Sequence, residues 1–354
     1  FFTNNRSSGF SFRISNHIMT SFAQRPPISA LISCLEDPSK PIGQRNRGSY
    51  FLRQYFEEDI ENIEIRMKVI ETLGNALKNI EHGALMRHEL AYLLGQLRNE
   101  AGCDYLESVL MDKNDNVMVR HECAEALGAI GAKRSLLPLQ LGSEEKESIE
   151  VSETCEIALD RLKWIEEGSD ITSEPQVCAC MSSPYSSIDP APPHPTHINL
   201  TISELGNRLL DSSIPLFERY RCMFSLRNIG NEECVIALGK TLIKDDSSAL
   251  LRHEVAYVLG QLQHPSSVEY LGISLRKLNE HNMVRHESAE ALGSIDGRYQ
   301  ETNDLLKEFS NDNDQVVRES CLVALDAVDY FGLYNNNDNN DDDNNTLKPS
   351  ESCN

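Results

Sequence analysis

The 354-residue sequence lacks several features that mark other classes of protein. It has no run of 18 or more apolar residues, so no segment is predicted to span a membrane. The residues before Met19, a candidate start, lack a compact apolar core, which disfavours a secretory signal. Arg6 and Arg13 stand there among Ser and Asn and leave a transit peptide open as an alternative.

Paired cysteines and basic residues are also scarce. None of the ten cysteines forms a C-x2-C pair, and the tightest pair is Cys178 and Cys180. This pattern disfavours a zinc ribbon or a disulfide-rich secreted domain and predicts a reducing, cytoplasmic location. Only 33 Lys and Arg stand against 55 Asp and Glu, for a net charge of -22. Phosphate binding needs clustered basic residues, so we expect no nucleic-acid partner and favour a cationic one.

The sequence lacks the alternating Val, Ile and Thr runs of strands and carries four copies of one helical motif instead. The copies are RHELAYLLGQL from Arg87, RHECAEALGAI from Arg120, RHEVAYVLGQL from Arg252 and RHESAEALGSI from Arg285. Within each pair the histidines are 33 residues apart, and the first pair precedes the second by 165. A short repeat within a long duplication predicts an all-α solenoid of helical hairpins. The helix ends and the Asp/Asn-rich turns resemble HEAT repeats, whereas ankyrin and TPR consensus residues are absent.

The duplication extends beyond the four motifs. QRNRGSYFLR from Gln44 parallels ERYRCMFSLR from Glu218, and VSETCEIALD from Val151 parallels VRESCLVALD from Val317. We therefore expect an α-α superhelix of about eight HEAT-like hairpins in two pseudo-symmetric halves of four, whose outer hairpins lack the His-Glu pair. The segments that begin at Gln44 and Glu218 are offset by 174 residues rather than 165, which predicts a surface insertion of about nine residues at EEDIENIEI.

Composition changes along the chain predict its boundaries. A Ser/Pro-rich passage that ends SSPYSSIDPAPPHPTH cannot be helical through its prolines, and the Asn/Asp-rich tail should be disordered. The predicted segments are a disordered extension at 1–26, a HEAT-repeat half at 27–167, a linker at 168–200, a second half at 201–332 and a disordered tail at 333–354.

The motif histidines point to a metal site. Residues three, four and seven positions apart share a helix face, so His88 looks along Ala91 and Gly95, and close helix packing is enough to explain these small residues. Packing does not explain four His-Glu pairs, because the outer repeats keep the helix and lose the His. Imidazole and carboxylate together suit a first-row transition metal with vacant positions. Four His and four Glu would supply two sets of two His and one carboxylate, with two carboxylates left over.

The surroundings of the motifs refine this prediction. The Asp/Asn-rich turns should place each His in about the first helical turn, where the positive helix end keeps imidazole unprotonated. The first motif is not the HExxH of zinc proteases, because Tyr92 stands where the second His belongs.

With these residues the chain closely resembles the deoxyhypusine hydroxylase family, the HEAT-repeat di-iron monooxygenases. The resemblance spans about Leu31 to Tyr330, and its most specific pieces are the four RHE motifs, RYRCMFSLRNIG from Arg219, HEVAYVLGQLQH from His253 and DPAPP from Asp189. It implies an enzyme that hydroxylates the deoxyhypusine side chain of the precursor of translation initiation factor five-A, with dioxygen and an electron donor. We expect it to act as a cytoplasmic monomer.

The resemblance also implies the roles of the motif residues. Two ferrous ions per chain would be bound, one by His88, His121 and Glu122 and the other by His253, His286 and Glu287. Glu89 and Glu254 would lie outside the metal set and beside the substrate, although both are adjacent to the ligands and are possible ligands themselves. Their carboxylates would there orient the amines of the deoxyhypusine side chain.

Two other functions fit parts of the pattern. HEAT arrays commonly act as non-catalytic protein-binding scaffolds, and bilin-lyase-type enzymes share the ALGxIG character of the helix ends. The retention of His-Glu in all four middle repeats favours the monooxygenase over a scaffold. No chromophore-binding residues that would support a lyase are recognisable in the sequence.

Overall fold

The computed structural model describes residues 26–167 and 183–337, and every regular element of more than one residue in these ranges is helical. This confirms the predicted all-α class. The first eight α-helices are α2 (Ile28–Glu36), α3 (Ile42–Glu58), α4 (Ile63–Lys78), α5 (Gly83–Gln96), α6 (Cys103–Leu110), α7 (Val117–Ile130), α8 (Leu136–Ser143) and α9 (Ile149–Glu166). The next eight are α10 (Ile202–Leu210), α11 (Leu216–Ile229), α12 (Glu232–Lys244), α13 (Ala249–Leu262), α14 (Ser267–Arg276), α15 (Asn282–Ser294), α16 (Tyr299–Phe309) and α17 (Gln315–Asn337).

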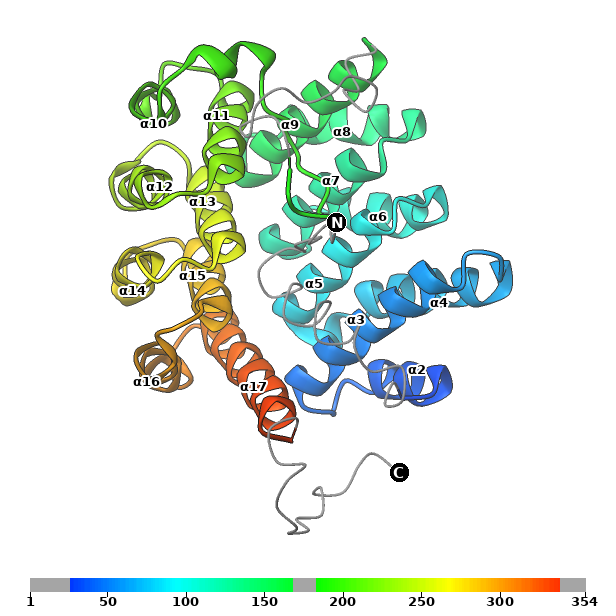
Figure 1. The fold of residues 1–354 in the computed structure, drawn as a ribbon. Helices are drawn as coiled ribbons and strands as arrows, with labels where there is room; N and C mark the ends of the chain where they lie inside the picture. The colour runs from blue at the N-terminus through cyan, green and yellow to red at the C-terminus, as the bar shows by residue number, and fades with distance from the viewer. Residues whose placement is uncertain (1–25, 168–182, 338–354) are drawn as a thin grey trace.

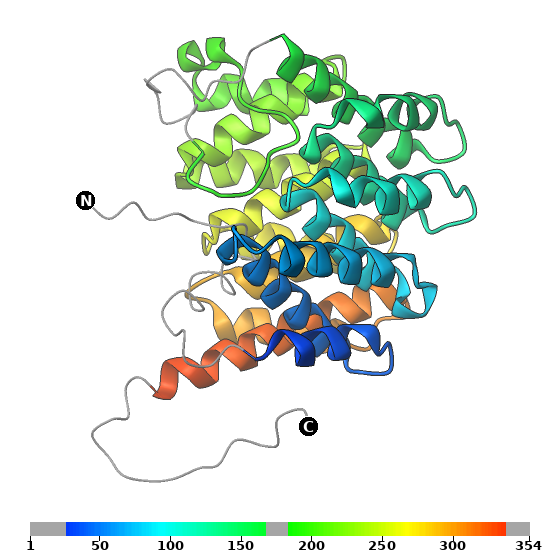
Figure 2. The same ribbon diagram turned by 90° about the vertical axis from the view of Figure 1, so that its right-hand side faces the viewer.

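The helices form two stacks of hairpins that face each other (Figure 1). In each hairpin the first helix lies on the outside and the second lies on the inside, so that α3, α5, α7 and α9 face α11, α13, α15 and α17. The stacking of successive hairpins is visible from the side in Figure 2. The stacks meet at both ends, because α9 contacts α11 and α13 while α17 contacts α3 and α5. The space between the inner helices is therefore bounded by helices from both halves.

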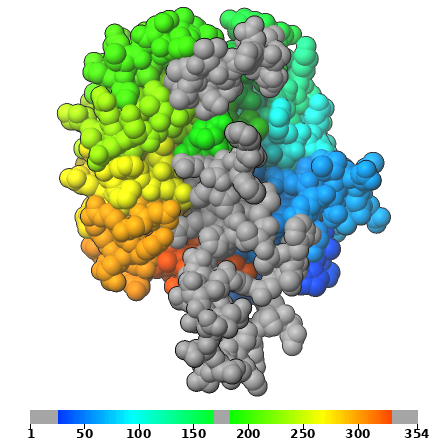
Figure 3. Space-filling view, viewed as in Figure 1, coloured from blue at the N-terminus to red at the C-terminus, as the bar shows by residue number. Residues whose placement is uncertain are grey.

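The described part of the passage between the halves contacts both of them. Residues 183–200 are described, and a short 3-10 helix, Pro195–Asn199, begins at the last proline of the passage that was predicted to be non-helical. The Ile188 amide donates to Gln96 Oε1 of the first half at 3.0 Å. The buried Arg227 guanidinium of the second half binds both Asp189 oxygens at 2.6 Å. Figure 3 shows green atoms of this region between the two flanks. The passage thus fastens one half to the other.

Other predicted segments fall at the edges of the described ranges. Residues 1–25, 168–182 and 338–354, which include Cys178 and Cys180, lie outside the described residues. Helix α17 continues to Asn337, so residues 333–337 are helical rather than part of the predicted tail. The acidic insertion lengthens α3 to 17 residues against 14 in α11, and its Ile60 and Ile63 side chains are exposed. Within the described parts, no helix is both long and apolar enough to cross a membrane.

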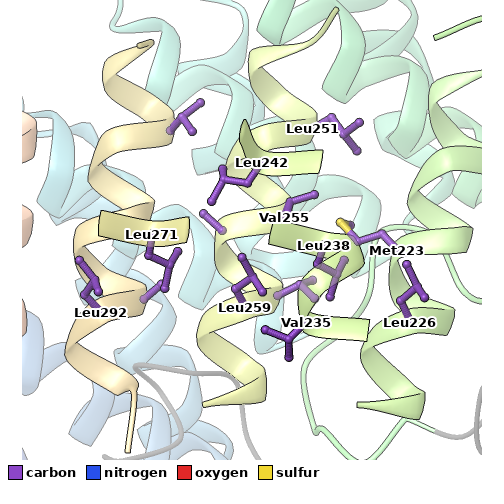
Figure 4. Close-up of a cluster of buried hydrophobic side chains, with 14 of the residues drawn as sticks. Met223, Leu226, Val235, Leu238, Leu242, Leu251, Val255, Leu259, Leu271 and Leu292 are labelled. Atoms are coloured by element: carbon purple, nitrogen blue, oxygen red, sulfur yellow. The ribbon is translucent and has the colours of Figure 1, made fainter. Parts of the chain in front are cut away.

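Each hairpin is held by apolar side chains between its two helices. Figure 4 shows this for the second half, where Leu238 and Leu242 of α12 meet Val255 and Leu259 of α13. All four side chains are at most 1% exposed. Burying aliphatic side chains of this size stabilises the fold by roughly 1.5–3 kcal/mol each. This packing holds the inner helices, and therefore the motif residues, in a rigid frame.

The Arg of each RHE motif joins neighbouring hairpins. Arg120 Nε donates to the Leu110 carbonyl at the end of the preceding outer helix, and its guanidinium binds Glu145 of the next hairpin at 2.7 and 2.8 Å. Arg87 and Arg285 make the same kind of bridge. So does Arg219, which lies in the first hairpin of the second half, where the inner helix has no motif His. The Arg is therefore a structural residue of the repeat, whereas the His-Glu pair is not.

The motif glycines allow successive inner helices to approach closely. A Cβ at Gly95 would lie 2.8 Å from the Ala126 Cα, and one at Gly128 would lie 2.8 Å from the Ala158 Cβ. Gly260 and Gly293 meet α15 and α17 in the same way. The interpretation of the small residues as packing residues is confirmed. The contacts also set the spacing between the helices that carry the histidines.

Candidate metal centre

The four motif histidines come from the four central inner helices, α5, α7, α13 and α15. Helix α7 begins at Val117, where the Asn116 side chain accepts the Met118 amide, so His121 is its fifth residue. His253 and His286 are also fifth in their helices, and His88 is sixth. Each His therefore begins the second turn rather than lying in the first turn as predicted. At that position it faces the interior between the two halves.

The structure gathers all four imidazoles into one cluster. The His88 ring centroid lies 5.4 Å from that of His121, 5.9 Å from that of His253 and 5.1 Å from that of His286. The second half closes the cluster, with His253 5.4 Å from His121 and 5.2 Å from His286. Contacts within a half and between halves are thus equally short. The cluster depends on both halves.

Two motif carboxylates meet the cluster in a pseudo-symmetric way. Glu122 Oε2 lies 3.2 Å from His88 Nε2, and Glu287 Oε2 lies 3.5 Å from His253 Nε2. In each half, therefore, the Glu of the second motif reaches the His of the first. His253, His286 and Glu287 also form one of the groups whose ligand atoms lie within 4.8 Å of one another. The other such groups are His88 with His121 and His253, and His121 with Glu122 and Glu125.

A pocket lies beside the histidines and collects six carboxylates. Four come from the motifs, and Glu125 and Glu290 follow His121 and His286 by four residues. Tyr50, Tyr92 and Tyr257 complete the polar lining, with the last two hydroxyls 3.2 Å apart across the halves. The site prediction omitted Glu125, Glu290 and the tyrosines. The helix face that holds each His already included positions 92, 125, 257 and 290, which was the available signal.

Burial and crowding shift the protonation of these groups. Burial, reinforced by neighbouring imidazoles, holds the pKa of His121, His253 and His286 well below the usual range. Burial also lowers the pKa of His88, but Glu122 and Glu89 outweigh it and raise that pKa well above normal. Burial and neighbouring carboxylates raise the pKa of Glu287 to about 8, and those of Glu125, Glu254 and Glu290 also rise. Without a cation, the buried pocket therefore disfavours the ionised form of these carboxylates.

The residues fit a metal centre by their unmet hydrogen-bonding capacity. Six imidazole nitrogens are buried without a hydrogen bond, namely His88 Nε2, both nitrogens of His121, both of His253 and His286 Nε2. Of these, His88 Nε2 and His253 Nε2 each lie near one carboxylate oxygen, at 3.2 and 3.5 Å. Buried polar atoms in folded proteins almost always have partners, and a bound ion is one explanation for a buried atom without one. Neutral imidazoles beside carboxylates are the donor set of first-row transition metals. A cation there would bind these nitrogens and reduce the repulsion among the carboxylates.

Comparison with known proteins agrees with this geometry. The profile of HEAT repeats matches residues 237–326, and that of the PBS lyase HEAT-like repeat matches residues 119–144. Deoxyhypusine hydroxylase of Danio rerio is 48% identical over 251 residues, which cover 71% of this chain and 78% of that protein. The chain belongs to the deoxyhypusine hydroxylase family. The family enzyme of Saccharomyces cerevisiae is 43% identical and covers 82% of this chain and 86% of its own length.

A solved member of the deoxyhypusine hydroxylase family has the same fold. The structure of the human enzyme in complex with glycerol matches with a TM-score of 0.74 at 41% identity, over 86% of this chain and 96% of that one. The resemblance first found in the RHE motifs is thereby confirmed. Membership in the deoxyhypusine hydroxylase family makes the chain an enzyme rather than a non-catalytic scaffold.

Proposed function

We propose that the chain is a deoxyhypusine monooxygenase that acts on the precursor of translation initiation factor five-A. It would use dioxygen and an electron donor at a centre of two ferrous ions and work as a monomer in the cytoplasm. The observation that carries the proposal is the cluster of four buried histidines, in which six ring nitrogens make no hydrogen bond. Membership in the family indicates which reaction the chain would catalyse, and the histidine cluster is where the two irons would bind.

The two ferrous ions would be held by the motif residues from both halves. We assign His88, His121 and Glu122 to one ion, supported by the 3.2 Å contact between His88 Nε2 and Glu122 Oε2. We assign His253, His286 and Glu287 to the other, supported by the proximity of their ligand atoms. When bound, the irons would activate dioxygen for insertion into a carbon-hydrogen bond of the substrate.

The remaining pocket residues suit a cationic side chain. Deoxyhypusine carries amines, and the pocket offers carboxylates beyond the proposed ligand set, of which Glu89 and Glu254 are the candidates from the motifs. A carboxylate that accepts an ammonium N–H makes a charge-assisted hydrogen bond, which fixes both position and orientation. Tyr92 of the first half and Tyr257 of the second half line the same pocket, and their hydroxyl oxygens lie 3.2 Å apart. The carboxylates would therefore hold the amines of the substrate, and the carbon to be hydroxylated would face the irons.

Iron binding tests the assignment directly. Protein loaded anaerobically with ferrous iron and then desalted should retain about two irons per chain, because two His-Glu sets are available. His88→Ala and His286→Ala should each lower that number, whereas His264→Ala, outside the pocket, should not. Hydroxylation of the deoxyhypusine-bearing factor by the loaded protein, measured by mass spectrometry, tests the reaction. Full iron retention in both pocket variants would contradict the ligand assignment.

A further inference from the structure

Three pairs of equivalent side chains follow one another along α5 and α13. They are His88 and His253, then Tyr92 and Tyr257 four residues later, and Gln96 and Gln261 eight residues later. Steps of four residues advance by about one turn along the same side of a helix. The tyrosines therefore lie about one turn beyond the histidines, and the glutamines about two turns, toward the C-terminal ends of both helices.

Residues 183–191 of the passage between the halves, which we call the strap, bind both of these glutamines. The Ile188 amide donates to Gln96 Oε1 at 3.0 Å, and Gln261 Nε2 donates to Ser187 Oγ at 3.0 Å. Two adjacent strap residues thus contact equivalent side chains of the two halves. The strap therefore joins α5 and α13 near their C-terminal ends.

Gln261, which is 2% exposed, connects the strap to the tyrosine pair. Its Oε1 accepts from Arg227 Nη1 at 3.1 Å, and its Nε2 donates to the Tyr257 hydroxyl at 3.1 Å as well as to Ser187. Because a guanidinium can only donate, the Arg227 contact fixes which end of the amide is the oxygen. The Tyr257 oxygen accepts from Gln261, so its hydroxyl hydrogen is available for Tyr92, 3.2 Å away in the other half.

The tyrosine pair forms one side of the rim of the pocket. Tyr92, Tyr257 and Glu125 are the partly exposed lining residues, and the other described lining residues are buried. Non-bonded carbon atoms need about 3.5–4.0 Å of separation, so a methylene chain cannot pass between two hydroxyl oxygens 3.2 Å apart. The way into the pocket therefore lies beside the pair, toward Glu125.

Glu125 of α7 and Glu290 of α15 stand at equivalent places, 165 residues apart, but Glu290 does not reach the rim. Glu290 is 4% exposed, and the Ser320 hydroxyl of α17 donates to its Oε1 at 3.0 Å. The counterpart of Ser320 in the first half is Thr154, whose hydroxyl donates to the Glu150 carbonyl at 2.7 Å. A carboxylate at a rim can accept the N–H groups of an alkylammonium ion as that ion leaves the solvent.

We infer that the cationic side chain of the substrate enters the pocket between Glu125 and the tyrosine pair, and that Gln261 is a positioning residue that ties this pair to the strap. Glu125 receives the amine at the rim. Ligand atoms of Glu125, His121 and Glu122 lie within 4.8 Å of one another, so an amine held by Glu125 is beside one set of proposed iron ligands. This inference rests on the proposed function and adds the route of the substrate to that site.

The rate of association with the deoxyhypusine-bearing factor tests the role of Glu125. It is measured by anaerobic stopped-flow on iron-loaded protein at several salt concentrations. Glu125→Gln should slow association about threefold or more and weaken its salt dependence, because a charge at the rim acts mainly on the association rate. Glu290→Gln, behind the rim, and Glu269→Gln, on the exposed side of the outer helix α14, should change that rate less than about 1.5-fold. Glu125→Gln should also retain as much iron as the wild type.

Steady-state kinetics test the role of Gln261. Gln261→Leu should raise KM about 2–10-fold and leave kcat within about twofold, because a loosened Tyr257 must be ordered again each time the substrate binds. Ser187→Ala, which removes only the contact of Gln261 with the strap, should raise KM in the same direction by less. Gln140→Leu, on the exposed side of α8, makes the same change of side chain away from the pocket and should leave KM unchanged. Urea unfolding of all variants identifies any change that is due to stability alone.

Three results would overturn the inference. The first is equal association rates for Glu125→Gln and Glu269→Gln. The second is a loss of iron in Glu125→Gln, which would make Glu125 a metal ligand. The third is a fall in kcat with unchanged KM in Gln261→Leu, which is the result expected if Gln261 only supports the fold. Failure of the proposed function would be visible earlier, as wild-type protein that retains no iron or does not hydroxylate the factor.

Discussion

Raising the pH from 7 to 8 should destabilise the metal-free protein because of Glu287. Burial, followed by the charges of Glu89 and Glu122, raises the pKa of Glu287 to about 8, against an ordinary value of 4.5. The folded chain therefore binds a proton that the unfolded chain has already released. For a group whose pKa is raised by folding, the stability it contributes is present at low pH and is lost as the pH rises through the folded pKa.

The size of the effect follows from the same values. With a folded pKa of about 8 and an unfolded group that is fully ionised, Glu287 alone lowers the free energy of unfolding by about 1 kcal/mol between pH 7 and 8. The raised pKa values of Glu125, Glu254 and Glu290 act in the same direction. The lowered pKa values of His121, His253 and His286 act mainly below pH 6.5, where the unfolded imidazoles protonate.

Urea unfolding of chelator-treated protein at pH 7.0, 7.5 and 8.0 measures this loss. Glu287→Gln should remove about 1 kcal/mol of the pH dependence, whereas Glu166→Gln, on the exposed end of α9, should leave it unchanged. Iron-loaded protein should show a weaker dependence, because the cations neutralise the carboxylates in place of protons. A free energy of unfolding that stays constant or rises from pH 7 to 8 in the metal-free protein would refute the reasoning.

Two further predictions concern the frame around the site. Glu145→Ala should lower the free energy of unfolding in urea by about 3–5 kcal/mol, because it leaves the Arg120 guanidinium, 2% exposed, without its partner; a loss below 1 kcal/mol would contradict this. Gly95→Ala should cost about 1–3 kcal/mol and reduce iron retention, because the new Cβ would lie 2.8 Å from the Ala126 Cα. Gly48→Ala is its control, since nothing lies within 4 Å of the new Cβ, and equal losses in the two variants would exclude the packing explanation.

The distribution of His and Arg among the repeats shows how far the sequence could be interpreted alone. Arg219 lies in a hairpin without a His and still bridges to the next hairpin through Asp245. Its presence there marks the Arg as part of the repeat, and the restriction of His to the middle hairpins marks the His as part of a site. That distinction needed only the comparison of repeats. The carboxylates that bind these arginines lie 25 to 28 residues further along the chain, in the turn of the next hairpin, and only the structure shows these contacts.

The carboxylates of the pocket show where sequence reasoning stopped. Four Glu follow a His directly, and the count of ligands left two of them over. Glu125 and Glu290 share a helix face with His121 and His286, but a shared face does not reveal what lies opposite. Whether these groups meet water, a cation or one another depends on helices that are more than a hundred residues away along the chain.

The sequence by itself determined the helical class, the two halves of four hairpins and the histidines of the site, because helix period and repeat length are local properties of the chain. Only the tertiary structure decided that the four imidazoles form a single cluster, that residues 183–191 fasten the halves together, and that the Tyr50 hydroxyl donates to Glu89. The physical reason is that a contact between two side chains depends on both of the helices that carry them, and these helices come from distant parts of the chain. Identical motifs in the two halves acquire different surroundings from the helices that pack against them.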